Sequence, residues 1–149
     1  MRDLKTLFNE LVRFETQTWN AIDARLRAEH GLPLGRFELM RVIASQADCR
    51  VYDVSAALSL TTGGASKLVD AIEAGGFCRR RPNPGDRRSS IIELTPAGKR
   101  LLAKATKTFE DELEKRIGSV LSDRNLQQLT SSLVKLRQSD PSKRGVFAA

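Results

Sequence analysis

The sequence is poor in the residues that build most catalytic and metal sites. It holds one histidine, His30, and 2 cysteines, Cys49 and Cys78, among 149 residues. No short spacing relates the two cysteines, so neither a disulfide framework nor a zinc site is indicated, and reduced thiols are the simplest expectation. A glycine-rich phosphate-binding loop is absent as well. These absences argue against an enzyme and predict no cofactor and no bound metal.

Long hydrophobic runs are also missing. No apolar stretch approaches the ~20 residues that a membrane-spanning helix needs, and the N-terminus reads as an amphipathic helix rather than a secretory signal. The expectation is a cytoplasmic protein without a membrane partner. With 40% hydrophobic and 29% charged residues, the chain is able to bury a core.

What the chain has in excess is positive charge. Its 25 lysines and arginines against 18 acidic residues give a formal net charge of +7. This balance favours an acidic partner, either nucleic acid or an anionic membrane surface, unless the charge serves only solubility. The arginines gather around one turn rather than along a basic amphipathic helix, which favours nucleic acid.

Hydrophobic periodicity predicts a mainly α chain with one small β-hairpin. Helices are expected at about 4–29, from 34, at 52–59, at 61–74, from 96, and from 122 or 123 to 140. Strand character covers 77–81 and 90–94, with the turn-forming stretch 82–86 between them. This order predicts an N-terminal dimerisation helix (1–33), a winged helix-turn-helix lobe (34–95), C-terminal dimerisation helices (96–140) and a loosely ordered tail (141–149).

The outer helices carry apolar stripes that a small middle lobe is too short to cover. Packing against the same helices of a second copy would bury them, which predicts a homodimer. The alternative is a monomer in which these helices fold back on the lobe.

The helix expected at 61–74 has the character of a recognition helix. An α-helix fits the major groove of DNA, and its N-terminal residues reach the base edges. Small polar residues at its start allow the backbone to come close, and Lys67 reaches a phosphate or a guanine edge. The alternative is an ordinary solvated helix start in which Thr61 or Thr62 serves only as the N-cap.

The hairpin strengthens the DNA-binding interpretation. Three arginines, at 79–81, precede its turn, and Arg87 and Arg88 follow it. Such a tip suits phosphates and the narrow minor groove. Asp86 is expected to hold one neighbouring guanidinium in a fixed direction through a charge-assisted pair. The alternative is a solvated charged face with a surface ion pair of little value.

These residues match the pattern of a known family. The stretch from Tyr52 to Leu102 closely resembles the MarR family of bacterial regulators, most tellingly in Asp86-Arg87-Arg88 and in Leu94-Thr95-Pro96-Ala97-Gly98. The resemblance implies a homodimer on a palindromic operator in double-stranded DNA. It also implies repression of its own or a neighbouring gene, and release from DNA by a small, often anionic phenolic effector or by an oxidant.

The resemblance also assigns residues. Arg88, oriented by Asp86, would enter the minor groove, and Arg87 would meet phosphate. Gly63 and Gly64 depart from the bulkier residues common in the family, which shifts specificity toward the remaining side chains and DNA shape. The full set expected to bind DNA is Thr61, Thr62, Gly63, Gly64, Ser66, Lys67, Arg80, Asp86, Arg87 and Arg88.

The sequence leaves open which signal such a regulator would sense. Cys78 lies near several arginines that would lower its pKa and make it a redox sensor, or it is a small hydrophobe in a strand. A ligand pocket is expected between the dimerisation helices and the DNA-binding lobe. For its aromatic residues, Trp19 and Phe37, packing in the core is the alternative. The pocket's candidate lining residues are Trp19, His30, Phe37 and Arg41. An architectural DNA-binding protein of low sequence specificity is the remaining alternative function.

Overall fold

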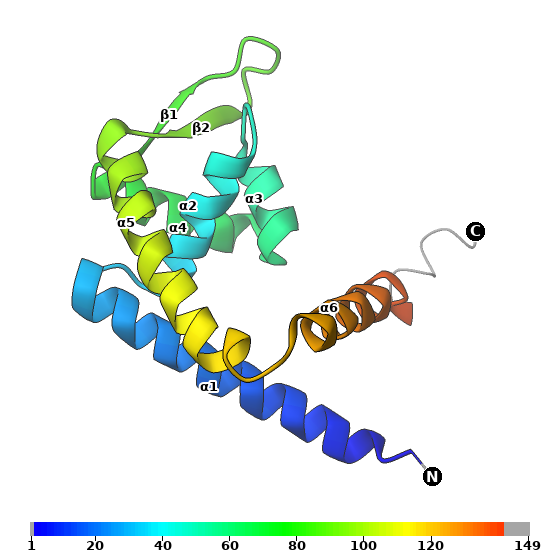
Figure 1. Cartoon of the computed structure of the whole chain (residues 1–149). Helices are drawn as coiled ribbons and strands as arrows, with labels where there is room; N and C mark the ends of the chain where they lie inside the picture. Colours follow the sequence, from blue (N-terminus) through cyan, green and yellow to red (C-terminus); the bar gives the residue numbers. More distant parts are fainter. Residues whose placement is uncertain (1, 142–149) are drawn as a thin grey trace. The chain divides into compact units, whose positions relative to one another are not determined.

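The computed structural model describes residues 2–141. Its contacts divide the chain into two compact units, Met1–Glu110 and Asp111–Ala149. In chain order the first unit holds α1 (Leu4–His30), α2 (Leu34–Ser45), α3 (Val51–Leu58), α4 (Thr62–Ala74), β1 (Cys78–Pro82), β2 (Ser90–Leu94) and most of α5 (Pro96–Leu113) (Figure 1). The predicted fold class, helices with one small hairpin, is confirmed. The expected loose tail lies outside the described residues, except for Pro141.

Side chains and glycines at the helix ends explain where two of the helices begin and end. The Gly64 amide donates to Thr61 Oγ1 (3.0 Å), so Thr61 is the N-cap of α4. Gly31 ends α1 in the left-handed conformation, at φ 62°. Gly76, at φ 82°, is the left-handed residue after α4. The residues expected from the sequence to begin and end these helices are therefore found at the helix ends.

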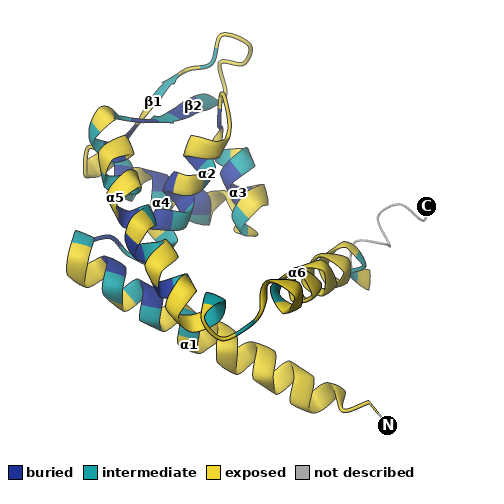
Figure 2. Cartoon of the chain, in the orientation of Figure 1, coloured by how far each residue is buried: buried dark blue, intermediate teal, exposed yellow. Residues whose placement is uncertain are grey.

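The core of the first unit gathers around α2. This helix contacts α1, α3, α4 and β2, so the helix pair and the hairpin share one support. The largest fully buried side chains come from all of these elements (Figure 2): Phe37, Leu26, Leu39, Met40, Ile72, Ile92, Val54, Val69 and Cys49. Removing this apolar surface from water is the main favourable contribution to the stability of the lobe.

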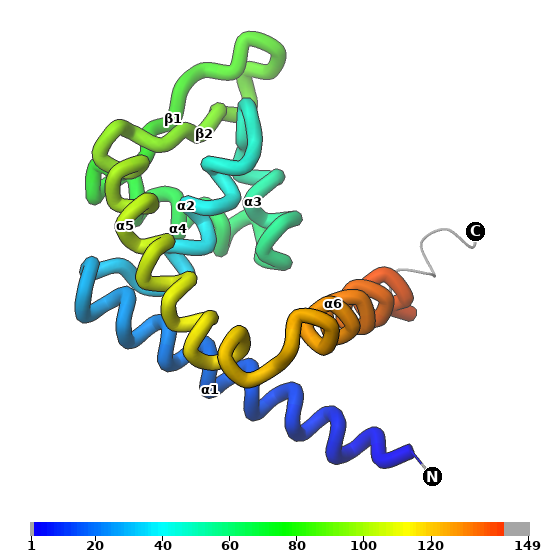
Figure 3. The backbone as a smooth tube through the Cα atoms, in the orientation of Figure 1, coloured from blue at the N-terminus to red at the C-terminus, as the bar shows by residue number. Residues whose placement is uncertain are grey.

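The hairpin is a two-stranded antiparallel sheet (Figure 3). Cys78 lies opposite Leu94 at its root, and both side chains are buried. The Ile92 amide donates to the Cys49 carbonyl (2.7 Å), which fastens β2 to the segment just before α3. The root of the hairpin is thus fixed to the helix-turn-helix pair.

The N-terminal half of α1 leaves its apolar side uncovered (Figure 2). Phe8 is 66% exposed and Leu7 is 52% exposed. The other exposed apolar residues of this half are Leu4, Leu11, Val12 and Phe14. A contiguous apolar stripe of this kind on a helix is typical of an interaction surface.

The second unit holds the end of α5, a π-helical turn η1 (Glu114–Gly118) and α6 (Asp123–Gln138). Ser122 begins α6, because its hydroxyl accepts a hydrogen bond from the Asn125 amide (3.2 Å). α6 also exposes apolar side chains: Leu129, Leu133, Val134 and Leu136. Within residues 2–141, no helix combines the length and the apolar character required to cross a bilayer.

Candidate nucleic-acid interface

A tight turn joins α3 to α4 and forms the helix-turn-helix pair. Ser59 adopts the left-handed conformation at φ 54°, and the Leu60 amide donates to the Ser55 carbonyl (2.9 Å). Because Ala65, Val69 and Ile72 of α4 are buried, one side of that helix is fixed against the core. The opposite side of its first turns faces solvent.

The first turns of α4 present most of the residues expected to meet DNA. Thr61, Thr62, Gly63 and Lys67 are exposed, whereas Gly64 and Ser66 are half-buried. The structure therefore brings these residues together at one helix start, where free amides and the helix dipole favour an anion such as phosphate.

The two glycines of this turn differ in what the fold requires of them. A Cβ on Gly64 would lie 3.1 Å from Thr61 Oγ1 and would crowd the N-cap. A Cβ on Gly63 would meet no atom within 4 Å. Nothing in the described part of the chain therefore requires glycine at 63. The missing side chain leaves the backbone accessible on the solvent-facing side of the helix.

The wing tip, residues 83–89, is organised by short-range hydrogen bonds. The Gly85 amide donates to Asn83 Oδ1 (3.0 Å), and the Arg88 amide donates to Asp86 Oδ1 (2.9 Å). Asn83 Nδ2 donates to Ser89 Oγ (3.1 Å) across the tip. Aspartate and asparagine side chains that bind the backbone two residues on are typical turn formers.

The role of Asp86 differs from the expected one. Its carboxylate binds the backbone amide of Arg88, and no ion pair joins it to a guanidinium within residues 2–141. Asp86 thus orients Arg88 through the main chain. Arg87 and Arg88 are both exposed, and neither forms an ion pair with a described carboxylate. They are therefore cations available to an external anion.

The three arginines of β1 are engaged within the lobe. Arg80 donates to Asp70 Oδ1 through Nη2 (2.7 Å) and to Glu73 Oε1 through Nη1 (2.8 Å). Both carboxylates belong to α4, so this side chain, which is expected from the sequence to contact DNA, joins the wing to α4. The acidic partners were not singled out in the sequence, because acidic residues are not an expected signal of a DNA-binding surface.

Arg79 and Arg81 lie on the other face of β1, as the alternation along a strand requires. Arg79 Nε donates to Glu93 Oε1 (2.7 Å), and Arg81 donates to Glu93 Oε2 (3.3 Å) and to Asp48 Oδ1 (2.8 Å). The hydrogen bond from Arg79 lowers the pKa of the Glu93 carboxyl, and this effect exceeds the opposing effect of burial. Glu93 is therefore held ionised between two arginines.

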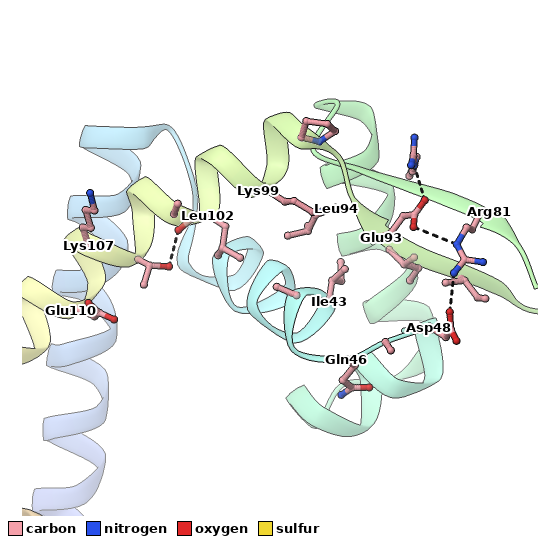
Figure 4. A pocket seen from close by; sticks show the side chains of 18 residues that line it. Ile43, Gln46, Asp48, Arg81, Glu93, Leu94, Lys99, Leu102, Lys107 and Glu110 are labelled. Atoms are coloured by element: carbon pink, nitrogen blue, oxygen red, sulfur yellow. Dashed lines mark hydrogen bonds and ion pairs between the residues drawn. The ribbon is translucent and has the colours of Figure 1, made fainter.

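A groove of about 970 Å³ lies between the end of α2, the hairpin and α5 (Figure 4). Ile43, Leu94 and Leu102 form apolar parts of its wall, and Arg81 bridges Glu93 and Asp48 at one end. Its size is in the range of cavities that bind small organic molecules.

The four expected pocket residues do not line this groove. Phe37 is fully buried and packs against Phe109, with ring centroids 4.9 Å apart. Arg41 stacks on Phe109, with its guanidinium carbon 4.9 Å from the ring centroid. His30 Nε2 lies 2.7 Å from Thr108 Oγ1 on α5, and Trp19 is 44% exposed on α1. For Phe37, core packing is the role that the structure supports.

Both cysteines are buried. Burial, reinforced by the nearby Glu73 carboxylate, raises the pKa of the Cys78 thiol to about 11, and the opposing influence of Arg80 is smaller. Burial raises the pKa of Cys49 to about 11 in the same way. The arginines near Cys78 therefore do not produce the reactive thiolate that a redox sensor needs. Within residues 2–141, no group of histidine, cysteine and acidic side chains has the arrangement of a metal site.

Known proteins share this sequence pattern and this fold. The sequence profile of the MarR family matches residues 32–90. Over 108 residues the chain is 29% identical to the HTH-type transcriptional regulator BilQ of Clostridium symbiosum, which covers 72% of this chain and 74% of BilQ.

The chain resembles the MarR family in sequence and in fold. Among solved MarR-family structures, it superposes on Sco3205 from Streptomyces coelicolor, determined in complex with DNA, with a TM-score of 0.86 at 19% identity. That match covers 93% of this chain and 89% of Sco3205. CouR from Rhodococcus jostii RHA1, determined with bound p-coumaroyl-CoA, gives a TM-score of 0.77 at 24% identity, covering 88% of this chain and 90% of CouR. These two likenesses show the MarR fold.

The resemblance to the MarR family indicates a DNA-binding transcriptional regulator. The winged helix-turn-helix fold predicted from the sequence is confirmed. The individual DNA contacts remain predictions, as do repression and release by a small effector.

Proposed function

We propose that this protein is a homodimer that binds a palindromic operator and represses its own or a neighbouring gene until a small ligand binds. One observation carries the proposal: Arg87 and Arg88 are exposed and unpaired among the described residues, on a tip that internal hydrogen bonds hold in shape. Since the partner is chromosomal DNA, the expected place of action is the bacterial cytoplasm.

In this proposal α4 lies in the major groove and the wing tip reaches the minor groove. Thr62, Ser66 and Lys67 supply the side chains that read bases or bind phosphate, and the open backbone at Gly63 allows close approach. Arg88 enters the minor groove, where the negative potential is strongest, and Arg87 binds phosphate. The remaining members of the proposed interface are Thr61, Gly64 and Asp86, which support these contacts.

The exposed apolar side of α1 supports the homodimer. A Phe8→Glu substitution should shift the protein toward monomer in sedimentation at micromolar concentration, because it places a charge in the proposed interface. Asn9→Glu is the matched control, since this neighbouring position lies off the apolar side of α1. A wild-type monomer at that concentration would contradict the proposed dimer.

The groove between α2, the hairpin and α5 is the proposed effector site. Lys99 and Lys107 line it, and neither forms an ion pair with a carboxylate among residues 2–141. Two free cations beside an apolar wall suit an amphipathic anion, and the p-coumaroyl-CoA bound to CouR is a ligand of that class. Lys107→Ala should weaken release of DNA by aromatic carboxylates, whereas Lys104→Ala, on the same helix but outside the groove lining, should not.

Selection of bound sites from genomic DNA fragments tests the whole proposal. We expect an inverted repeat near the protein's own gene, bound at least ~10³-fold more tightly than random DNA. Reporter expression from that promoter should fall when the protein is present. Equal affinity for the selected and the random fragments would instead indicate an architectural DNA-binding protein.

A further inference from the structure

Arg80 makes three hydrogen bonds to two carboxylates of α4. Its guanidinium reaches Asp70 and Glu73, as described above, and its backbone amide donates to Glu73 Oε2 (3.0 Å). Asp70 and Glu73 are three residues apart and therefore lie on one side of the helix. With 25% of the Arg80 side chain exposed, this junction is partly shielded from water.

This junction lies at a position along β1 where it can determine the direction of the wing tip. On the N-terminal side of Arg80, the hairpin is fixed by buried side chains such as Cys78. The amide of Phe77 also donates to the Ile72 carbonyl of α4 (3.1 Å). Beyond Arg80, strand β1 continues only to Pro82, which is exposed. Arg80 is thus the last residue of β1 that binds α4 before the chain enters the tip that carries Arg88.

The charges at this junction are otherwise unfavourable for DNA binding. Asp70 and Glu73 lie on the recognition helix, and their side chains are 63% and 39% exposed. Unpaired carboxylates at that place would repel phosphates. Paired with Arg80 they are neutralised, and in return they fix the direction of the guanidinium.

We propose that Arg80, Asp70 and Glu73 form a clamp that sets the wing tip relative to α4, so that Arg80 is a positioning residue rather than a DNA contact. This inference rests on the proposed operator binding. It assigns a positive role in DNA affinity to two acidic residues. Simple electrostatics predicts the opposite, because removing an acidic residue raises the net charge of the protein.

The test measures operator affinity by fluorescence anisotropy over a range of salt concentrations. Glu73→Gln and Asp70→Asn should each weaken binding several-fold, and Arg80→Ala should weaken it at least tenfold. The slope of log affinity against log salt should change by less than one for all three variants, because Arg80, Asp70 and Glu73 themselves contact no phosphate in this proposal. Glu10→Gln on α1 is the control: it also removes one negative charge, but at a site outside the wing, and it should not weaken binding.

A charge exchange separates positioning from a loss of folding. Combining Arg80→Glu with Glu73→Arg should recover part of the affinity lost in either single variant, while thermal unfolding shows that all variants are folded. Hydrogen exchange of the hairpin amides should accelerate in Glu73→Gln and Arg80→Ala. The clamp would be overturned if Arg80→Ala lowered the salt slope by about one while Glu73→Gln bound normally or more tightly. Failure of operator binding itself appears separately, as a wild type that does not distinguish operator from random DNA.

Discussion

Gly98, in the first turn of α5, packs directly against the carbonyl group of Phe77, the residue that precedes β1. A Cβ at position 98 would overlap that carbonyl oxygen. The same carbonyl accepts a hydrogen bond from the Thr95 amide (3.1 Å), and Thr95 Oγ1 donates to the Gly76 carbonyl (2.7 Å). The Leu-Thr-Pro-Ala-Gly stretch is therefore the joint that attaches α5 to the root of the wing.

Gly98→Ala should lower the free energy of unfolding by roughly 1–3 kcal/mol, the usual cost of forcing extra atoms into a packed site. Backbone atoms cannot move aside as a flexible side chain does, so the cost exceeds the helix propensity that alanine gains. Chemical denaturation measures this difference. A variant as stable as the wild type would show that the backbone around Phe77 and Gly98 shifts at little cost to make room for the methyl group.

Gly63→Ala is the matched substitution in open space. It should raise the free energy of unfolding by up to about 1 kcal/mol, because alanine favours the helix. Operator affinity should nevertheless fall by about tenfold, or roughly 1.4 kcal/mol, since the added methyl group stands between the backbone and DNA. Denaturation and anisotropy titration of the same sample test both effects. Unchanged affinity would show that no close approach occurs at this residue.

Arg88→Ala should weaken operator binding by about 1–3 kcal/mol without changing stability, because its side chain has no partner in the described part of the lobe. A gel-shift titration measures the loss. Arg13→Ala, an exposed arginine on α1, is the control and should bind as the wild type does. Equal binding by Arg88→Ala would exclude this arginine from the mechanism.

The thiols should be unreactive in the folded protein. With the pKa of Cys78 raised to about 11, on the order of one molecule in a thousand carries the thiolate at pH 8. A disulfide reagent should therefore modify Cys49 and Cys78 rapidly only in denaturant, and peroxide should leave operator binding intact. Rapid reaction of a native thiol near neutral pH would restore the redox hypothesis.

The same thiols affect stability at alkaline pH. Folding raises each thiol pKa from its ordinary value of 9.0 to about 11, so the folded state holds the proton more tightly. This contribution is fully present below about pH 9 and is lost as the pH rises toward 11. Cys78→Ser should therefore show a smaller fall in stability over that interval than the wild type.

Local features of the fold could be predicted from the sequence because they depend on neighbouring residues. Thr61 caps α4 and Thr95 caps α5 through amides only three residues away. The partners of the β1 arginines could not be predicted in this way. Arg81 binds Asp48, which is 33 residues earlier in the chain, and only the folded lobe brings them together.

The expected pocket around Trp19, His30, Phe37 and Arg41 stays a prediction, because periodicity alone does not show which side chains face a pocket. Periodicity marks Phe37 and Trp19 as apolar positions on helices but does not show which of them meets the core. The groove described above is lined by the end of α2, the hairpin and one side of α5, which are far apart in the sequence. Likewise, the sequence places Asp86 beside two guanidinium groups, and only the turn geometry shows that its carboxylate binds a main-chain amide.

The three consecutive arginines of β1 also determine how the two strands align. Arg79 and Arg81 meet Glu93 on one face, and Arg80 meets Asp70 and Glu73 on the other. A slip of the strand by one residue would turn every side chain to the opposite face. Two arginines would then compete for the carboxylates of α4, and Glu93 would lose one of its two partners. This arrangement of charges therefore favours the observed strand register, and with it the length of the loop at the wing tip.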